Sequence, residues 1–322
     1  MSQRKKNQLT DEPPQYLSTE VDNEIDLREL FFVLWNRKWL IIAITFVFAV
    51  ASVIVALSLP NIYKSEVLLA PAESTNNNSL ANMAGQFGGI AGLVGVNLQN
   101  NDGSQAGLAM QVIQSRQFTQ MFIEKHDLLV PLMAAEGWDL SSNNLIIDED
   151  AYDTSNARWL RAPEGLRGAK PSAQEAHEVF IGEYLNIQQD EETGLYKLSI
   201  SYYSPYLAEK WVSWLVEDIN DVMRERTIAE ATKNLEYLNN QLDKTSVAEM
   251  QSTFYKLIEE QTKKLMLAEV QDEFVFKVVD PAVVPELKNK PNRALICVLG
   301  TFLGGIVSCV MVILISVFRK ES

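Results

Sequence analysis

The sequence predicts an α+β protein in which two membrane-spanning helices flank one large folded region. Three observations lead to this fold class. Two charge-free apolar runs lie near the two ends of the chain, and two strand-like segments joined by a glycine-containing turn lie between them. A stretch of 75 residues after Pro205 contains neither proline nor glycine, which is typical of long helices.

The apolar runs are long enough to cross a bilayer. Residues 39–59 and 294–318 form runs of 21 and 25 residues without a charge, and a spanning helix needs ~20 such residues. A cleaved signal peptide does not fit the first run, because 38 residues precede it and a signal core is only ~7–15 residues long. Two buried core helices are the alternative, which the polar composition of the remaining chain disfavours.

Basic residues at the outer flanks of the two runs predict the orientation. Arg37 and Lys38 precede the first run, and Arg319 and Lys320 follow the second. Since positive charge collects on the cytoplasmic side, both termini are expected there, with residues 60–293 outside. Basic residues at 288, 290 and 293 oppose this but carry little weight, because loops longer than ~60 residues translocate largely regardless of charge.

Charge and cysteine usage limit the function classes. The net charge of -14 falls on the external region, which holds 20 basic and 34 acidic residues. Such a surface disfavours polyanions, so no nucleic-acid partner is expected. Cys297 and Cys309 both lie in the second run, ~18 Å apart along a helix, which is beyond disulfide reach. The external region is therefore expected to fold around an ordinary apolar core.

The first half of the external region predicts short elements. These are a strand at Tyr63–Ala70, a helical pattern over Gln105–His126, a polar surface connection over residues 139–171, and a helix opened by a capping box at Ser172–Glu175. The Gly- and Asn-rich residues 76–104 favour a flexible loop, with packing on a neighbour or on the membrane surface as the alternative.

The second half predicts a hairpin and then a helical extension. Strand patterns cover residues 183–189 and 195–203, and a last strand covers residues 274–279. Ser204 and Pro205 provide an N-cap and a first-turn proline, while LDKTS at 242–246 predicts a turn between two antiparallel helices. A helix over residues 205–242 would span ~57 Å. Its apolar stripes fit either a core or coiled coil within one subunit, or packing between subunits. The length favours a homo-oligomer.

Two motifs near the second apolar run are candidate interaction sites. Pro281, Pro285 and Pro291 form a proline-rich connector, which we expect to be stiff and extended because proline fixes φ and cannot donate to a ladder. Gly300, Gly304 and Gly305 form a small-residue pattern that allows close helix contact in a membrane, although glycine is also common in membrane helices without such a role.

No pattern of catalytic, cofactor-binding or metal-ligating residues is found. His126 and His177 are 51 residues apart and match no zinc motif, and neither a nucleophile elbow nor a phosphate-binding loop occurs. The acidic group from Asp148 to Asp153 lacks the glycine and terminal Glu of a calcium loop, which favours a solvated loop. A membrane-anchored glycosidase remains as an alternative, because paired carboxylates are set by spatial separation. We expect a protein that is not an enzyme and has no cofactor.

The two ends of the chain resemble the Wzz-type chain-length determinants, the polysaccharide co-polymerases of bacterial envelopes. EIDLRELFFVLWNRKW (24–39) is similar to the N-terminal signature of the family, and FVFKVVDPAVVPELKNKPNRAL (274–295) is similar to its proline-rich segment. The glycine-rich GQFGGIAGLVG (85–95) resembles a loop of branches that export polysaccharide. The kinase-bearing members continue into a cytoplasmic nucleotide-binding domain, whereas this sequence ends at Ser322, which favours the kinase-lacking branch.

The resemblance implies a bacterial inner-membrane protein with a small membrane-proximal mixed sheet and a long extended helical hairpin in the periplasm. It also implies a homo-oligomeric scaffold that acts with an integral-membrane polymerase on a lipid-linked glycan, such as O-antigen of lipopolysaccharide. An adaptor for polysaccharide export or for a separately encoded tyrosine kinase is the alternative. The expected segments are 1–38, 39–59, 60–203 (α/β base), 204–273 (helical extension), 274–293 (last strand and connector), 294–318 and 319–322.

Overall fold

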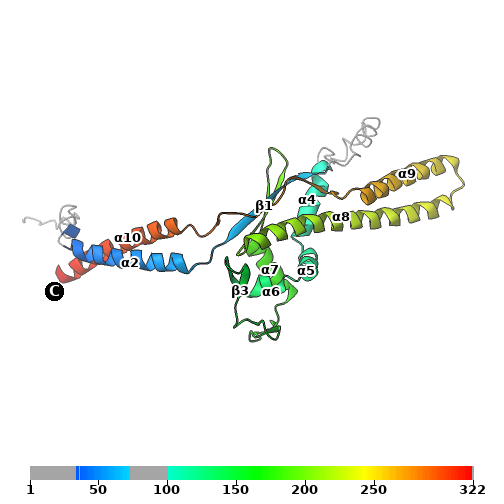
Figure 1. Cartoon of the computed structure of the whole chain (residues 1–322). Coiled ribbons are helices and arrows are strands. Elements are labelled where there is room, and N and C mark those ends of the chain that lie inside the picture. The colour runs from blue at the N-terminus through cyan, green and yellow to red at the C-terminus, as the bar shows by residue number, and fades with distance from the viewer. Residues whose placement is uncertain (1–33, 36, 73–100, 321–322) are drawn as a thin grey trace, which may run out of the picture. The chain divides into compact units, whose positions relative to one another are not determined.

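The computed structural model describes residues 34, 35, 37–72 and 101–320. The N-terminal signature up to residue 33, the glycine-rich residues 85–95 and the last two residues lie outside this range. The chain divides into two compact units, one made of the residues up to Ala56 together with those from Arg293 onward, and one that extends from Leu57 to Asn292. Figure 1 shows the elements of both units.

Two apolar helices make up most of the described part of the first unit. Helix α2 covers Lys38–Ser58 and helix α10 covers Arg293–Lys320, within two residues of the ranges expected from the sequence. Both are long and apolar enough to cross a membrane, and only 6% and 17% of their most apolar windows are buried. The core helix of a soluble protein would be mostly buried, so these apolar surfaces fit contact with lipid.

The second unit is built on a four-stranded sheet. Its strands are β1 (Tyr63–Pro71), β6 (Leu185–Gln189), β7 (Tyr196–Tyr202) and β8 (Phe276–Asp280). Their order is β6-β7-β1-β8, and every neighbouring pair is antiparallel. The expected mixed sheet is therefore corrected to an antiparallel one. The reason is the helical hairpin between β7 and β8, which carries the chain out and back, so that β8 runs opposite to β1.

A helical hairpin joins β7 to β8, as the sequence predicts. Helix α8 covers Pro205–Leu242, and helix α9 covers Ala248–Val270 and folds back along it (Figure 1). The Ser204 hydroxyl accepts a hydrogen bond from the Leu207 amide at 3.4 Å, with Pro205 in the first turn. Residues 243–247 form the turn, where Thr245 donates its hydroxyl to the Gln241 carbonyl at 2.9 Å. The local capping signals thus placed both ends of α8.

Short elements occupy the part of the chain between β1 and β6 that the structure describes. They are α4 (Asn101–Ile113), α5 (Arg116–Lys125), α6 (Leu129–Ala134), the hairpin β2 (Ala135–Asp139) with β3 (Asn144–Ile147), the pair β4 (Tyr152–Asp153) with β5 (Arg158–Trp159), α7 (Ala173–Val179) and the π-helical η3 (Phe180–Tyr184). Three expectations are corrected here. The helical pattern at 105–126 is two helices, the polar connection at 139–171 contains two hairpins, and the strand expected from Glu183 begins at Leu185.

Side-chain oxygens explain two of these corrections. The Ser115 hydroxyl accepts a hydrogen bond from the Phe118 amide at 3.3 Å and caps the start of α5. The spacing of apolar residues continues across this break, so the sequence pattern does not reveal it. The Asp139 carboxylate accepts hydrogen bonds from the amides of Ser141 and Ser142 at 3.2 and 3.1 Å and closes the β2–β3 turn. Such short side-chain bonds compete with regular structure, so a polar sequence appears irregular although it forms a tight hairpin.

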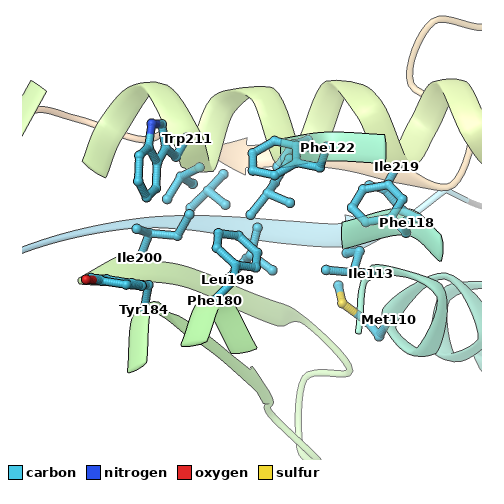
Figure 2. Close-up of a cluster of buried hydrophobic side chains, with 14 of the residues drawn as sticks. Met110, Ile113, Phe118, Phe122, Phe180, Tyr184, Leu198, Ile200, Trp211 and Ile219 are labelled. Carbon is cyan, nitrogen blue, oxygen red and sulfur yellow. The ribbon is translucent and has the colours of Figure 1, made fainter. Parts of the chain in front are cut away.

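The core lies between α8, the sheet and the short helices. Figure 2 shows Trp211 and Ile219 of α8 above Leu198 and Ile200 of β7, with aromatic side chains from α5 and η3 filling the space between. These four side chains are fully buried. The apolar stripe at the start of α8 therefore packs within one subunit, whereas the remainder of the helical hairpin buries little.

The two histidines, unassigned at the sequence level, belong to this packing. Asp218 of α8 is 1% exposed, and its carboxylate accepts a hydrogen bond from Lys125 at 2.5 Å and lies 2.9 Å from Nε2 of His126. The His126 ring stacks on Trp214 with centroids 4.1 Å apart. Nδ1 of His177 lies 3.2 Å from the hydroxyl of Thr119. Both rings thus fasten short helices to their neighbours.

The capping box gives a testable pH dependence. Glu175 accepts hydrogen bonds from Arg161 at 2.9 Å and from the Ser172 amide at 2.8 Å, and these bonds lower its pKa from 4.5 to about 2. The unfolded chain then binds more protons than the folded chain between these values, so stability is lost as pH falls from about 4.5 to 2. We expect Glu175→Gln to flatten the acid limb of a thermal-midpoint titration. An unchanged limb would contradict this assignment.

Candidate functional site: the seam between β1 and the proline-rich connector

The segment that leaves α2 is hydrogen-bonded to the segment that leads into α10. Leu68–Pro71 of β1 pairs with Phe276–Asp280 of β8. Beyond this ladder, the Ser65 hydroxyl donates to the Val283 carbonyl at 2.9 Å. The Ile62 amide then donates to the Lys290 carbonyl at 2.9 Å, and the Ile62 carbonyl accepts from the Asn289 amide at 2.8 Å. We call this set of contacts the seam.

The structure places the three connector prolines along the seam. Pro281 follows β8 directly and is exposed, while Pro285 and Pro291 are half-buried. None of them has an N–H to donate, and the hydrogen bonds to the β1 segment come from the non-proline residues between them. That the connector is stiff and extended stays a prediction. Its fastening to Ile62 and Ser65 was not foreseen, because the pairing joins residues more than 200 positions apart.

Asn220 ties the long helix to the start of the seam. Its amide nitrogen donates to the Phe276 carbonyl at 3.1 Å, and its carbonyl oxygen accepts from the amides of Val275 and Phe276 at 2.8 and 2.9 Å. The side chain is 4% exposed. The Asn220 side chain therefore makes the backbone hydrogen bonds that a neighbouring strand would otherwise make at the start of β8. The sequence held one signal for it, an amide within the buried apolar stripe of α8 next to Ile219.

A cavity of about 510 Å³ opens beside Asn220. Its polar lining includes Asp221 and Arg224, whose side chains form an ion pair at 2.7 Å, and Asp272, which lies 3.8 Å from Arg224. Val67 and Pro281 supply apolar walls. The cavity thus lies against the first connector residue, and its charged groups already pair with one another.

The predicted glycines lie on two sides of α10. A Cβ at Gly300 would fall 3.0 Å from the Ser52 hydroxyl, and one at Gly304 would fall 2.8 Å from Cγ of Phe48, both on α2. A Cβ at Gly305 would meet no atom within 4 Å among the described residues. Gly300 and Gly304 therefore allow the close approach of α2 and α10 within one chain, whereas Gly305 lies apart from that contact.

This difference predicts opposite results for two adjacent substitutions. Gly304→Val is expected to lower the thermal unfolding midpoint of the detergent-solubilised protein, because the added methyl groups overlap Phe48 and overpacking costs about 1–3 kcal/mol. Gly305→Val, its neighbour with open space, is the matched control and should leave the midpoint nearly unchanged. Equal midpoints for the two variants would contradict the close contact of α2 with α10.

The flanking charges are only partly described. Arg37 precedes α2, and its carbonyl accepts hydrogen bonds from the amides of Leu40 and Ile41 at 3.0 and 3.2 Å. The ammonium of Lys38 lies 5.0 Å from the centre of the Trp35 ring. Arg319 and Lys320 end helix α10, and their side chains lie outside the described residues.

The part of the chain that the structure describes contains no group of three or more His, Cys, Asp or Glu residues that could hold a metal ion. The acidic stretch near Asp148 instead builds turns. Asp148 accepts hydrogen bonds from the amides of Asp150 and Ala151 at 2.9 and 3.3 Å, and Asp153 accepts from Asn156 at 2.7 Å. These carboxylates therefore have structural partners within their own turns.

Two family models match the chain, and each match includes one side of the seam. Residues 23–126 match the family model described as Wzz, chain length determinant protein. Residues 238–316 match the model described as GNVR, G-rich domain on putative tyrosine kinase. No curated protein matches the chain.

Two solved structures are similar to the chain at low identity. One is a full-length bacterial polysaccharide co-polymerase, with 13% identity, a TM-score of 0.38, and coverage of 92% of this chain and 99% of that one. The other is a fragment of WzzB, a polysaccharide co-polymerase from Salmonella Typhimurium, with 9% identity, a TM-score of 0.32, and coverage of 71% and 99%.

Proposed function

The chain belongs to the Wzz-type family of chain-length determinants, and from this premise we propose that it regulates the length of a surface polysaccharide without being an enzyme. O-antigen or a related glycan is the polymer class. The protein acts as an oligomeric scaffold in the bacterial inner membrane, beside an integral-membrane polymerase that extends a lipid-linked glycan.

One observation carries this proposal. The two matched regions lie at opposite ends of the sequence, yet β1 belongs to the first and β8 with the connector belongs to the second, and they meet along the seam. The features typical of the family thus form a single hydrogen-bonded assembly. Asn220 then attaches that assembly to the long helix. A scaffold that must hold a tall helical hairpin over a membrane needs this kind of continuous attachment.

In the proposed topology, α2 and α10 both span the membrane. Arg37 and Lys38 at one end and Arg319 and Lys320 at the other keep both termini in the cytoplasm by the preference of basic residues for that side. The unit Leu57–Asn292 is then periplasmic. Gly300 and Gly304 hold the two spans of one chain together.

The helical hairpin supports the homo-oligomeric part of the proposal. Ala268 is the one buried residue of α9, and large apolar side chains remain exposed along its length and at the turn before it. They include Val247, Met250, Tyr255, Met266 and Val270. This number of exposed large apolar side chains on one helical hairpin supports its contact with another copy.

The direct test is a gel of surface polysaccharide from cells with and without the gene. Loss of a modal length band, with polymer still present at random lengths, is the expected result for a regulator of chain length. Loss of the polymer altogether would overturn the proposal and would favour a role in export.

The adaptor for export or for a separately encoded tyrosine kinase is the second candidate. The description of the model matched by residues 238–316 refers to putative tyrosine kinases, which is the observation that favours it. An adaptor predicts that deletion lowers tyrosine phosphorylation of a partner kinase in the same cells. A length regulator predicts unchanged phosphorylation with a changed length distribution.

The connector gives a further prediction. Replacing both Pro285 and Pro291 with alanine is expected to broaden the modal length distribution, because the segment loses its fixed φ angles while the seam hydrogen bonds at Ile62 and Ser65 remain. Pro171, at the distant start of the α7 capping box, is the control proline. An unchanged distribution in the double variant would show that stiffness of the connector is not needed.

A further inference from the structure

Three aromatic rings from separate parts of the chain gather beside the start of β1. The rings of Tyr63 and Trp138 have centroids 5.8 Å apart at 83°, and the rings of Trp138 and Tyr206 have centroids 6.1 Å apart at 60°. Tyr206 is 50% exposed, and the other two are half-buried. We call these three residues the aromatic cluster. It takes no part in the buried core of the unit.

An exposed leucine lies next to the cluster. Leu140 is 77% exposed at the tip of the β2–β3 hairpin, two residues beyond Trp138. The turn is held by the carboxylate of Asp139, which accepts hydrogen bonds from the hydroxyls of Ser141 and Ser142 at 2.6 and 2.7 Å. Burial of this leucine against an apolar partner would be favourable, because it would remove apolar surface from water.

The position of the cluster along the chain identifies the partner. Tyr63 follows the last residue of α2 by five positions, so at most ~18 Å of extended chain separates them. The seam contact between Ile62 and Lys290 brings the residues just before α10 to the same point. Helix α2 therefore ends a few residues before Tyr63, and helix α10 begins a few residues after the seam partner of Ile62.

The charge nearby fits the same partner. Lys288 and Lys290 are exposed on the connector, where the ammonium of Lys288 lies 3.4 Å from the side-chain oxygen of Asn61. Leu287, which directly precedes Lys288, is 84% exposed. Aromatic rings, a protruding aliphatic side chain and basic residues are the combination that favours the boundary between lipid headgroups and acyl chains.

From this geometry we infer that Tyr63, Trp138 and Tyr206, with Leu140, form a contact surface for the phospholipid bilayer. The surface seats the periplasmic unit on the membrane independently of its covalent links to the spans. Tyrosine and tryptophan suit this position because each combines an apolar ring with a polar group that stays hydrated. The inference rests on the proposed membrane placement of α2 and α10.

A platform for sugar stacking is the competing explanation of exposed aromatic rings, and the geometry disfavours it. The rings meet edge to face, so they do not present one flat surface. The indole N–H of Trp138 already donates to the Asn143 side chain at 3.0 Å, and Leu140 offers no hydrogen bond to a sugar.

The test uses the full chain in nanodiscs of phosphatidylethanolamine and phosphatidylglycerol, with part of the lipid carrying a nitroxide near the headgroup. Cys297→Ser and Cys309→Ser remove the native thiols, and a fluorophore is attached to a single new cysteine. Tyr206→Cys reports the cluster. Tyr237→Cys is the matched control, since Tyr237 is also exposed on α8 but lies 31 residues further along, which is ~47 Å of helix. Phe302→Cys, on the exposed face of α10, reports the span itself.

The expected result is that the labels at 302 and 206 lose about half of their emission or more to the lipid nitroxide, while the label at 237 keeps its emission. Quenching at 302 with no more quenching at 206 than at 237 would overturn the bilayer contact and leave the proposed spans intact. No quenching at 302 would overturn the membrane placement and the contact together. Quenching at 206 that is absent with lipid but appears with a nitroxide-labelled dextran would also overturn the inference and favour a sugar platform.

A second pair of variants examines the leucine. Leu140→Asp, combined with the label at 206, is expected to reduce the quenching, because a carboxylate resists entry into the bilayer boundary. Leu166→Asp is the control, since Leu166 is another exposed leucine of the same unit. Equal quenching in the two variants would exclude Leu140 from the contact surface.

Discussion

Replacing Asn220 with alanine is expected to lower the free energy of unfolding by about 3 kcal/mol, because the change leaves three buried backbone groups at the start of β8 without their partner. The groups are the amides of Val275 and Phe276 and the carbonyl of Phe276. Alanine cannot replace any of these bonds, and water has little access to a position that is 4% exposed. Chemical denaturation of the detergent-solubilised protein, followed by tryptophan fluorescence, measures the loss.

Asn234→Ala is the matched control on the same helix. Asn234 makes one side-chain hydrogen bond, to Gln261 of α9 at 3.4 Å, at a partly buried position. We expect it to cost less than about 1 kcal/mol. A similar cost for Asn220→Ala would show that β8 is held by its ladder with β1 alone. In cells, Asn220→Ala should broaden the polysaccharide length distribution if the seam transmits the position of α8.

Replacing Trp211 with alanine is expected to lower the free energy of unfolding by about 4 kcal/mol, since large-to-small changes of fully buried aromatic residues leave a cavity. The Trp211 ring contacts two tyrosines, with centroids 4.3 Å from Tyr202 and 6.4 Å from Tyr184. Figure 2 shows Trp211 beside the ribbon of α8, at one end of the labelled cluster.

Trp211→Phe separates the ring from its polar group. Among the described residues, no atom accepts a hydrogen bond from the buried Trp211 indole N–H. Phenylalanine removes this unpaired donor and keeps most of the aromatic contact, so we expect a cost well below that of alanine, less than about 1.5 kcal/mol. Equal losses for phenylalanine and alanine would show that the indole N–H is satisfied after all.

Features that depend on residues close together in the sequence were predicted better than features that depend on distant residues. The ends of α8, the turn after it and the capping box at Ser172 were all predicted, because each depends on residues within four positions of one another. The apolar helices were predicted because hydropathy is a property of a continuous segment. The break at Ser115 was missed, since a serine that caps a helix and one that lies within a helix have similar neighbours.

The candidate site shows the same division. The prolines of the connector could be recognised, but their attachment to Ile62 and Ser65 could not, because the partners are more than 200 residues apart. Nothing in the sequence separated Gly305 from Gly300 and Gly304, yet only Gly300 and Gly304 face α2. Asn220 had no recognisable motif, since its role depends on β8, which comes 56 residues later.

The sequence by itself determined the two apolar helices, the helical hairpin, the connector prolines and the resemblance at both ends, because these are patterns of local periodicity and composition. Only the tertiary structure decided that the sheet is antiparallel, that Asn220 holds β8, and that three aromatic rings meet beside the start of β1. Strand direction and side-chain pairing depend on which distant segments exclude water from one another, and that choice is made by the packing of the whole unit.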